Sequence, residues 1–548
     1  MLRSVLRITA CAGLLVASVS GSACAQREGV NGVLVIATGA DVSTPVPGVD
    51  QNQTNWQVTN LLFLRLAELG PTLSTVGDKD FVPMLARSWK RRDSVTVVFE
   101  LDPRALWHDG TPVTSRDVVF TFERSHQIPD LATATQRIAS VTADGPTRVV
   151  FRFRHGYAEQ LYDATYHLMI LPEHLLAGIP QDSIAASEFG KHPVGSGPFR
   201  WVRRVPDQVI ELAAFDKFFL GKPKMDRIYF RVARAPDARL NLLLSGDADV
   251  TELLSWAAVQ RLQGNQEFSI IPVTSPAITY ALFNQKAPGD RTRPHPILSD
   301  ARVRRALVLA LDRPAMLRAV YGPYAVGNDG PVPQIFAWVE EPGHNAVRTD
   351  TAAARRLLAD AGWTDHNGDG ILDKDGMPLE LTINSPNASP QRPMFAQQMQ
   401  ERWRQLGIKA NVQLLDGPIW VQRRNAGQFD IDMSNAQLDP TPSGWRNSWS
   451  CATAGKPAQN VGSYCDPAID SLLQAAYTSR DVVPVYRRIL AHIREDAPAV
   501  FLSAPANVVA VHRRFATRPL RSDMIWLGLR DWSVTPGLQL PRDRARGN

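Results

Sequence analysis

Hydrophobic positions follow two different periods along the chain, and the two kinds of segment alternate. Apolar residues recur at every second position, as in half-buried strands, at 95–102, 147–154 and 377–385. Mainly apolar runs at 32–39 and 278–284 indicate two further strands. Because segments with helical spacing lie between the strands, the sequence predicts the α/β class.

The helical segments carry start and stop signals. Thr114 or Ser115 can cap a helix over 114–125, and Gly246 stops one over 237–247. After residue 284 the helical patterns lengthen, and 299–322 has the spacing of one long helix. The elements predicted beyond it are helices at 351–362, 398–408, 470–477 and 485–498, and strands at 409–415, 499–505 and 507–512.

The first 25 residues differ in pattern from the rest. Arg3 and Arg7 precede a short apolar stretch, and Ala23 to Ala25 have the small-x-small spacing of a cleavage site. We interpret residues 1–25 as a secretory signal peptide and expect a periplasmic or extracellular protein. The alternatives are a membrane anchor, for which the stretch is short, and a lipid at Cys24, where Gly21 replaces the usual aliphatic residue. No later run has 18 consecutive apolar residues, so we expect a soluble mature chain.

Charge and cysteine content limit the kinds of partner and cross-link expected for this protein. The 548 residues suffice for two or three domains, and removing the signal lowers the formal charge from +6 to +4. Neither a basic stripe with interleaved aromatics nor a run of five like charges is present, so nucleic acid is not expected. Cleavage leaves only Cys451 and Cys465, and an exported chain with one such pair predicts a disulfide rather than free thiols or a metal site.

Catalytic motifs are missing from the sequence. It has no G-x-S-x-G elbow, no H-E-x-x-H, no phosphate-binding G-x-x-x-x-G-K-[ST] and no G-x-G-x-x-G. His108, in "WHDGTP", is expected to be a turn residue bonded to backbone. The sequence therefore favours a binding protein that is not an enzyme and needs no cofactor.

Five phrases, in order, resemble a known family, the extracellular solute-binding proteins of ABC importers that include oligopeptide-, dipeptide- and nickel-binding members. They begin with "FVPMLARSWKRRDSVTVVFELDPRALWHDGTP" from residue 81 and "HPVGSGPFRW" from residue 192. "FNQKAPGDRTRPHPILSDARVRRALVLALDR", "VGSYCDPAIDSLL" and "REDAPAVFL" follow. The resemblance spans about residues 30 to 532. It implies capture of a peptide or small polar solute and delivery to a membrane permease, by a protein we expect to be a monomer.

The resemblance also implies the fold, that of type II periplasmic binding proteins, with two lobes, a hinge and an inserted subdomain. The expected order after the signal peptide is 26–66 in lobe I, 67–196 as the inserted subdomain and 197–284 again in lobe I. Lobe II is expected at 285–508 and a final lobe I segment at 509–548. The alternatives are an exported hydrolase, which would need a catalytic group in its cleft, and a ligand sensor without a transport role.

The ligand contacts follow from one phrase. The family's peptide binders carry an Asp for the ligand amine four residues before a Pro, and aligning on Asp439-Pro440 puts Ala436 at that place. A buried ammonium needs a carboxylate, and the nearest are Asp432 and Asp439. Free-amine peptides are therefore doubtful ligands. The contacts that we predict are Asn435, Gln437, Asp439, Trp445, Arg446 and Trp449, with Tyr280 and Asn284 nearer the lobe crossing; packing is the alternative for both Trp, and Trp420 is expected in the core.

One further segment, 365–376, has the first half of an EF-hand loop. Asp365, Asn367 and Asp369 alternate before Gly370, and Asp373 could add a ligand. Position twelve is Gly376 instead of the bidentate Glu, and a strand pattern follows where a helix should be. We predict a helix-to-hairpin turn here, with a calcium site as the alternative.

Overall fold

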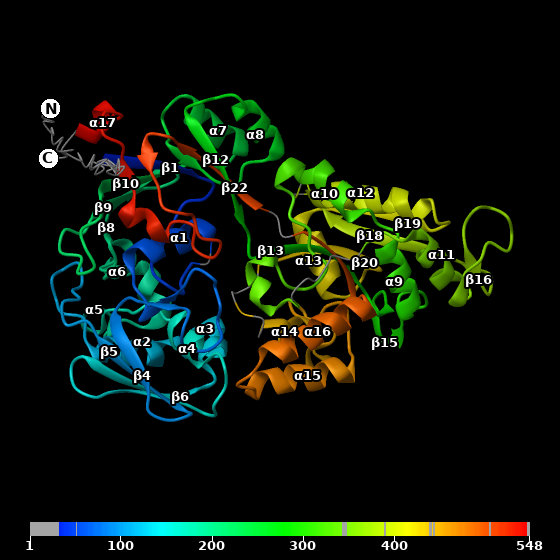
Figure 1. The fold of residues 1–548 in the computed structure, drawn as a ribbon, viewed down its shortest axis with the longest axis horizontal. Helices are drawn as coiled ribbons and strands as arrows, with labels where there is room; N and C mark the ends of the chain where they lie inside the picture. Colours follow the sequence, from blue (N-terminus) through cyan, green and yellow to red (C-terminus); the bar gives the residue numbers. More distant parts are fainter. Residues whose placement is uncertain are drawn as a thin grey trace, which may run out of the picture.

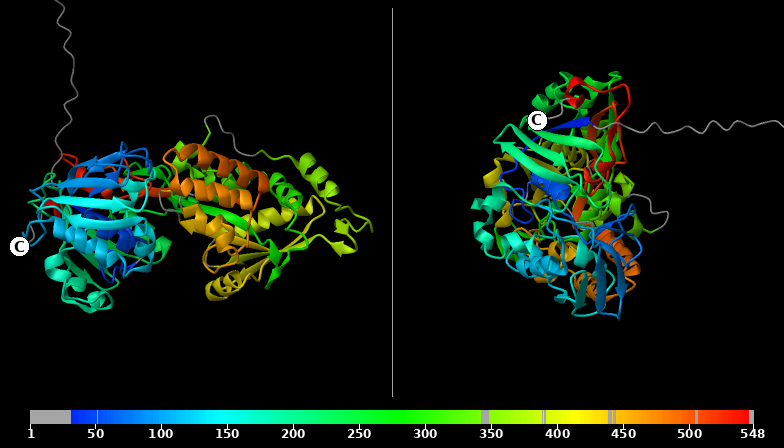
Figure 2. Two further views of the ribbon diagram at one scale, coloured as in Figure 1. Left: turned by 90° about the horizontal axis from the view of Figure 1, so that it is seen from below. Right: turned by 90° about the vertical axis from the view of Figure 1, so that its left-hand side faces the viewer.

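The computed structural model describes residues 32–544, except 51, 342–347, 388, 390, 438–440, 442–443 and 504–505. The chain forms two bodies side by side, blue to cyan with green and red on one side and green to orange on the other (Figure 1). The view from below separates the same two bodies (Figure 2). We call the body that contains the chain's first strand the first lobe and the other the second lobe. Both lobes combine sheets with helices, as the α/β prediction required.

The first lobe is built on a seven-stranded sheet of order β12-β22-β11-β1-β10-β9-β8. Its central strand β1 is buried along its whole length because its side chains are almost all apolar. The other strands come from two distant parts of the sequence, residues 199–274 and 506–512. Bounds are β1 Gly32–Thr38, β8 Phe199–Val205, β9 Val209–Ala214, β10 Met225–Val232, β11 Val250–Thr251, β12 Phe268–Thr274 and β22 Ala506–His512.

A four-stranded antiparallel sheet of order β4-β5-β7-β6 is inserted into this lobe. Its strands alternate, so that Val97, Phe99 and Leu101 point into the core while their neighbours are less buried. These side chains belong to the same hydrophobic cluster as those of the large sheet, so the insertion shares the first lobe's core. Bounds are β4 Ala86–Arg91, β5 Thr96–Leu101, β6 Ile138–Ala143 and β7 Arg148–Phe153.

The helices of the first lobe are mostly short. Asn52 caps α1 by accepting a bond from the Asn55 amide, and Thr114 with Asp117 forms the capping box of α2. Bounds are α1 Gln53–Leu62, α2 Ser115–Ser125, α3 Pro129–Thr135, α4 Gln160–Thr165, α5 Glu173–Leu176, α6 Glu188–Lys191, α7 Pro236–Leu244, α8 Trp256–Leu262 and α17 Pro541–Arg544.

The second lobe is built on a five-stranded sheet of order β19-β18-β20-β13-β21. Successive residues of β13 enter different cores: Tyr280 and Leu282 one, Ala281 and Phe283 the other. The sheet is therefore covered on both faces. Bounds are β13 Ala277–Phe283, β18 Glu380–Pro386, β19 Lys409–Leu415, β20 Ile431–Gln437 and β21 Ala499–Ser503.

One prediction for the helices of the second lobe is wrong. The expected helix over 299–322 is two helices, α9 and α10, because Asp312 caps the second one at the Ala315 amide and Pro314 has no N–H to continue the first. Bounds are α9 Ala301–Leu309, α10 Arg313–Tyr321, α11 Thr351–Asp360, α12 Gln391–Arg404, α13 Gly417–Asn425, α14 Trp445–Trp449, α15 Pro467–Thr478 and α16 Val483–Asp496.

The chain passes between the lobes twice. β12 belongs to the first sheet and β13 to the second, so the first passage lies at residues 275–276. β21 belongs to the second sheet and β22 to the first, so the second passage falls at 504–505, outside the described residues. These positions precede the boundaries expected at 284 and 508, because β13 pairs with β20 and β21 and β22 pairs with β12. The remaining domain boundaries stay predictions.

His108 is a structural residue, as its turn context suggested. Its Nδ1 accepts the Gly195 amide at 3.1 Å, and its Nε2 bonds the Gly197 carbonyl at 3.0 Å. Burial lowers the pKa of His108 to about 4, which keeps the ring neutral. A Cβ at Gly195 would lie 1.9 Å from the Leu62 carbonyl oxygen, so the close approach of the two backbones requires glycine.

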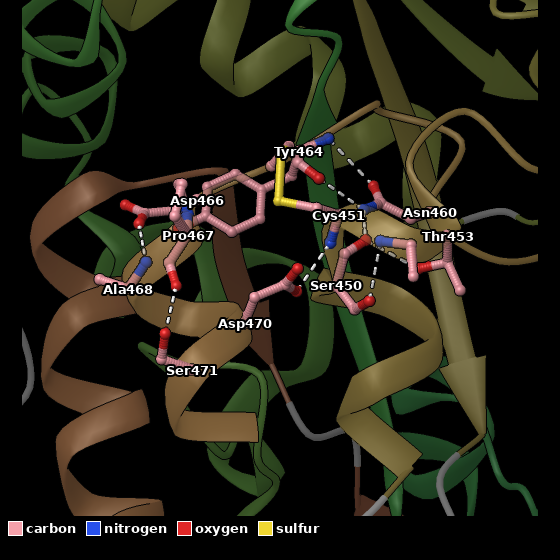
Figure 3. Close-up of a disulfide and its surroundings, with 12 residues drawn as sticks. Ser450, Cys451, Thr453, Asn460, Tyr464, Asp466, Pro467, Ala468, Asp470 and Ser471 are labelled. Carbon is pink, nitrogen blue, oxygen red and sulfur yellow. Dashed lines mark hydrogen bonds between the residues drawn. A yellow bond between two sulfur atoms is a disulfide. The ribbon is translucent and has the colours of Figure 1, made fainter. Parts of the chain in front are cut away.

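The disulfide predicted between Cys451 and Cys465 is present (Figure 3). Asn460 fastens the loop between them, donating to the carbonyls of Ser450 and Tyr464 and accepting the Tyr464 amide. Closing a loop with a sequence separation of 14 contributes about 3 kcal/mol in the chain-entropy model. The disulfide therefore fixes the segment that follows α14.

No helix in the described part of the chain is both long enough and apolar enough to cross a membrane.

Candidate functional site

Thr441, in the stretch where the ligand contacts were predicted, lies at the boundary of the two lobes. The Thr441 hydroxyl donates a hydrogen bond to Glu159, which precedes α4 in the first lobe. Beside it, the Ala158 amide donates to the Ser479 carbonyl of the second lobe at 3.1 Å. Ala158 is buried in the hydrophobic cluster of α14, α15 and α16. The His155 and Tyr477 rings also meet across this boundary, with centroids 5.5 Å apart. We call these contacts of residues 155–159 with Thr441, Tyr477 and Ser479 the lobe seam.

Glu159 is the most connected residue of the seam. Its side chain accepts hydrogen bonds from Thr75 at 2.9 Å within its own lobe and from Thr441 of the other lobe. Glu159 is 3% exposed, and the Arg137 guanidinium, 3.7 Å away, is its nearest cation. A buried carboxylate that accepts bonds from both lobes favours the arrangement in which they touch.

Arg137 lies beside Glu159 on the first-lobe side of the seam. It pairs in bidentate fashion with Asp163, at 2.7 and 2.9 Å, and Asp163 also accepts the Tyr157 hydroxyl at 2.6 Å. Burial raises the pKa of Asp163 and Arg137 opposes this. The Arg137 guanidinium lies 5.1 Å from the ring centroid of Tyr477 in the second lobe. Arg137 therefore orders the first-lobe side of the seam.

The predicted aromatic contacts are packed inside the second lobe. Trp445 is 2% exposed and its ring lies against Tyr486, while Trp449 is 3% exposed between Tyr464 and Phe501. Tyr280 is also buried, in the same cluster. The burial of Trp445 and Trp449 agrees with packing, the alternative considered for the Trp pair.

The predicted polar contacts include both buried and exposed side chains. Asn284 is buried and its amide donates to the carbonyls of Gly427 and Phe429, a structural use. Asn435 and Arg446 are exposed, and Arg446 lies over Tyr477 at the seam, 5.2 Å from the ring centroid. Gln437 ends β20, and Asp439 falls outside the described residues. Among the predicted contacts whose side chains the structure describes, Asn435 and Arg446 are thus open to a solute.

Asp432, considered as a replacement for the missing amine-binding Asp, is already engaged. It is 1% exposed and accepts the Trp420 indole N–H at 2.7 Å and the Ser434 hydroxyl at 2.5 Å. Arg424 lies 3.3 Å from it. Burial raises the pKa of Asp432, and the Arg424 guanidinium opposes the rise. Trp420, expected in the core, is only half buried and serves this carboxylate.

Glu252 is a buried carboxylate of the first lobe, and it lies close to the start of β22. Glu252 accepts the amides of Gln57 at 2.7 Å and Asn507 at 3.1 Å. Asn507 stands at the start of β22, where the chain has just entered the first lobe. Nearby, the ring of Trp256 meets that of Tyr324 in the second lobe, with centroids 6.0 Å apart. The lobes therefore touch at the seam and again near the passages.

Sequence reasoning missed Glu159, Arg137 and Arg424. Glu159 lies in "YAEQLYDATYH", a stretch without any binding motif, and its partners are remote in sequence. The one signal in the sequence was Ala436, which stands where the resembled peptide binders carry an Asp for the ligand amine.

The loop at 365–376 is a turn, as predicted. Asp365 accepts the amides of Gly368 and Gly370, Asn367 that of Asp369, and Asp369 that of Ile371. Asp373 bonds His366. The hairpin of β16 (Asp373–Lys374) and β17 (Met377–Pro378) follows, at the end of the second lobe away from the first (Figure 1).

We expect calcium to leave the melting temperature of the protein unchanged. The carboxylates of Asp365 and Asp369 are used by the turn's own amides, and no bidentate Glu completes the loop. A calcium titration followed by circular dichroism tests this, with an Asp369→Ala variant as control. A rise of the melting temperature in the parent protein that the variant lacks would restore the calcium site.

Comparison with known proteins agrees with this architecture. The family model described as bacterial extracellular solute-binding proteins, family 5 middle, matches residues 80–457. The oligopeptide-binding protein AppA of Bacillus subtilis is 26% identical over 522 residues, covering 92% of both chains.

Two solved structures have the same fold. AppA from Bacillus subtilis, in complex with a nonapeptide, has a TM-score of 0.73 and 23% identity, covering 93% of this chain and 100% of that one. NikZ from Campylobacter jejuni, in complex with Ni(L-His), has a TM-score of 0.74 and 23% identity, covering 91% and 99%.

Proposed function

The chain belongs to the bacterial extracellular solute-binding proteins of family 5, and we propose that it is the exported substrate-binding component of an ABC importer. The match over residues 80–457 carries the proposal. The solute is a peptide-like or other small polar molecule that the protein delivers to a membrane permease. Relatives named for oligopeptides and a neighbour holding Ni(L-His) support this range of solutes. The hydrolase and sensor alternatives gain no support from these relatives.

The mechanism is hinge closure. The passage between the sheets at 275–276 forms part of the hinge, and the solute sits between the lobes. Contacts to both lobes make the solute favour the closed state, in which the lobe seam forms. Asn435 and Arg446 are proposed contacts, since both are exposed on the second lobe. No chemistry on the solute is involved.

Residues 1–25 serve, in this proposal, as a cleaved signal peptide that exports the protein to the periplasm. A lipid at Cys24 is the alternative, and mass spectrometry of the mature N-terminus distinguishes the two outcomes.

A melting-shift screen tests the function. We expect at least one solute among peptides, oligosaccharides and metal chelates to raise the melting temperature by roughly 2–3 °C at a hundredfold excess over its Kd. The same solute should be recovered unchanged after incubation. Turnover at an enzyme-like rate, or a panel without any shift, would contradict the proposal.

A further inference from the structure

Arg392, a half-buried arginine of the second lobe, has no carboxylate of its own. It stands near the start of α12 and donates one bond, from Nη1 to the Met433 carbonyl at 3.2 Å. Among the described residues, no Asp or Glu forms an ion pair with it. Most of its five N–H donors are therefore available to another molecule.

The carboxylate nearest to Arg392 is already used. Asp432 accepts Trp420 and Ser434 and pairs with Arg424. The guanidinium carbons of Arg392 and Arg424 lie 5.0 and 5.7 Å from the ring centroid of Trp420. Two guanidinium groups thus lie against one indole, while only Arg424 pairs with the buried carboxylate, and the cluster keeps one positive charge in excess.

The cluster lies where the lobes meet. Tyr321 of α10 packs its ring against Phe395 of α12, the helix that carries Arg392, with centroids 5.8 Å apart. The next residue, Gly322, packs so closely on Trp256 of the first lobe that a Cβ would lie 2.6 Å from the indole Cδ2. A solute between the lobes can therefore approach Arg392 beside the hinge.

We propose that Arg392 binds a carboxylate of the solute, with Trp420 beneath its guanidinium. The inference rests on the proposed function and names the solute class, molecules with a free carboxylate. Arg424 and Asp432 neutralise each other and hold the indole in place. A solute carboxylate would balance the excess charge and form two parallel N–H···O bonds with Arg392. This arrangement accounts for Ala436, because a solute held by its acidic end needs no carboxylate for its amine.

Calorimetric titration with matched peptides tests the subsite. The probes are trialanine, its C-terminal amide, and an Ala-Glu-Ala amide that carries its carboxylate on a side chain. The variants are Arg392→Gln and, on the exposed face of the same helix, Arg402→Gln as control. We expect the parent and Arg402→Gln to bind trialanine about 30-fold more tightly than its amide, and Arg392→Gln to lose that preference. Binding of the Ala-Glu-Ala amide would identify a side-chain carboxylate as the recognised group.

Two results would overturn the subsite. One is equal binding of trialanine and its amide by the parent, without binding of the Glu-containing amide. The other is an unchanged preference in Arg392→Gln. Failure of the parent to bind any solute of the wider panel contradicts the proposed function itself and removes the subsite with it.

Discussion

Replacing Glu159 with alanine is expected to weaken solute binding by about 100-fold while the protein stays folded. Thr441 donates to Glu159 only when the lobes touch, and a hydrogen bond to a charged group contributes about 1.5–3 kcal/mol. Without it the closed state becomes less populated, and solute binding has to supply the difference. Arg137 keeps its bidentate bond to Asp163, so the first-lobe corner remains in place.

Calorimetric titration with a solute from the screen measures this effect. Glu188→Ala, an exposed carboxylate of α6 in the same lobe, serves as the control and should bind as the parent does. Thr441→Val removes the donor from the opposite lobe, and its effect should be smaller in the Glu159→Ala background than in the parent. Equal affinities of parent and Glu159→Ala would show that the seam does not contribute to solute capture.

Replacing Asp249 with alanine is expected to lower the free energy of unfolding by about 3–5 kcal/mol. Asp249 is buried and accepts Arg514 at 2.8 and 3.1 Å, and it also accepts the Val35 amide of β1. Arg514 is itself 1% exposed and comes from the C-terminal segment. Removing the carboxylate leaves a buried guanidinium undercompensated and loosens the segment's attachment to the first lobe.

Urea denaturation checks this, with Asp247→Ala as the control. Asp247 is two residues away, with 58% of its side chain exposed, and its pair with Arg231 should contribute less than about 1 kcal/mol. A loss in Asp249→Ala no larger than in Asp247→Ala would mean that Asp543, the second partner of Arg514, suffices.

Local features of the fold could be predicted because their causes lie close together in the sequence. The hairpin at Asp375-Gly376, the turn around His108 and the pairing of Cys451 with Cys465 depend on residues next to each other or on a count of two. The break at Asp312 was missed, although Pro314 was visible, because the apolar spacing continues through it.

The candidate site was harder to predict because its contacts are distant in sequence. Thr441 and Glu159 are 282 positions apart, and nothing in either phrase indicates the other. The aromatic residues chosen as solute contacts, Trp445 and Trp449, have the composition of a binding surface but pack inside the lobe. Burial decides between the two roles, and a single sequence does not contain it.

The central claim is that the two lobes close on a solute, and small-angle X-ray scattering tests it most directly. We predict that a saturating solute from the screen lowers the radius of gyration of the parent protein, and that Glu159→Ala needs far more solute for the same change. A radius of gyration unchanged at saturation, with binding confirmed by calorimetry, would contradict closure.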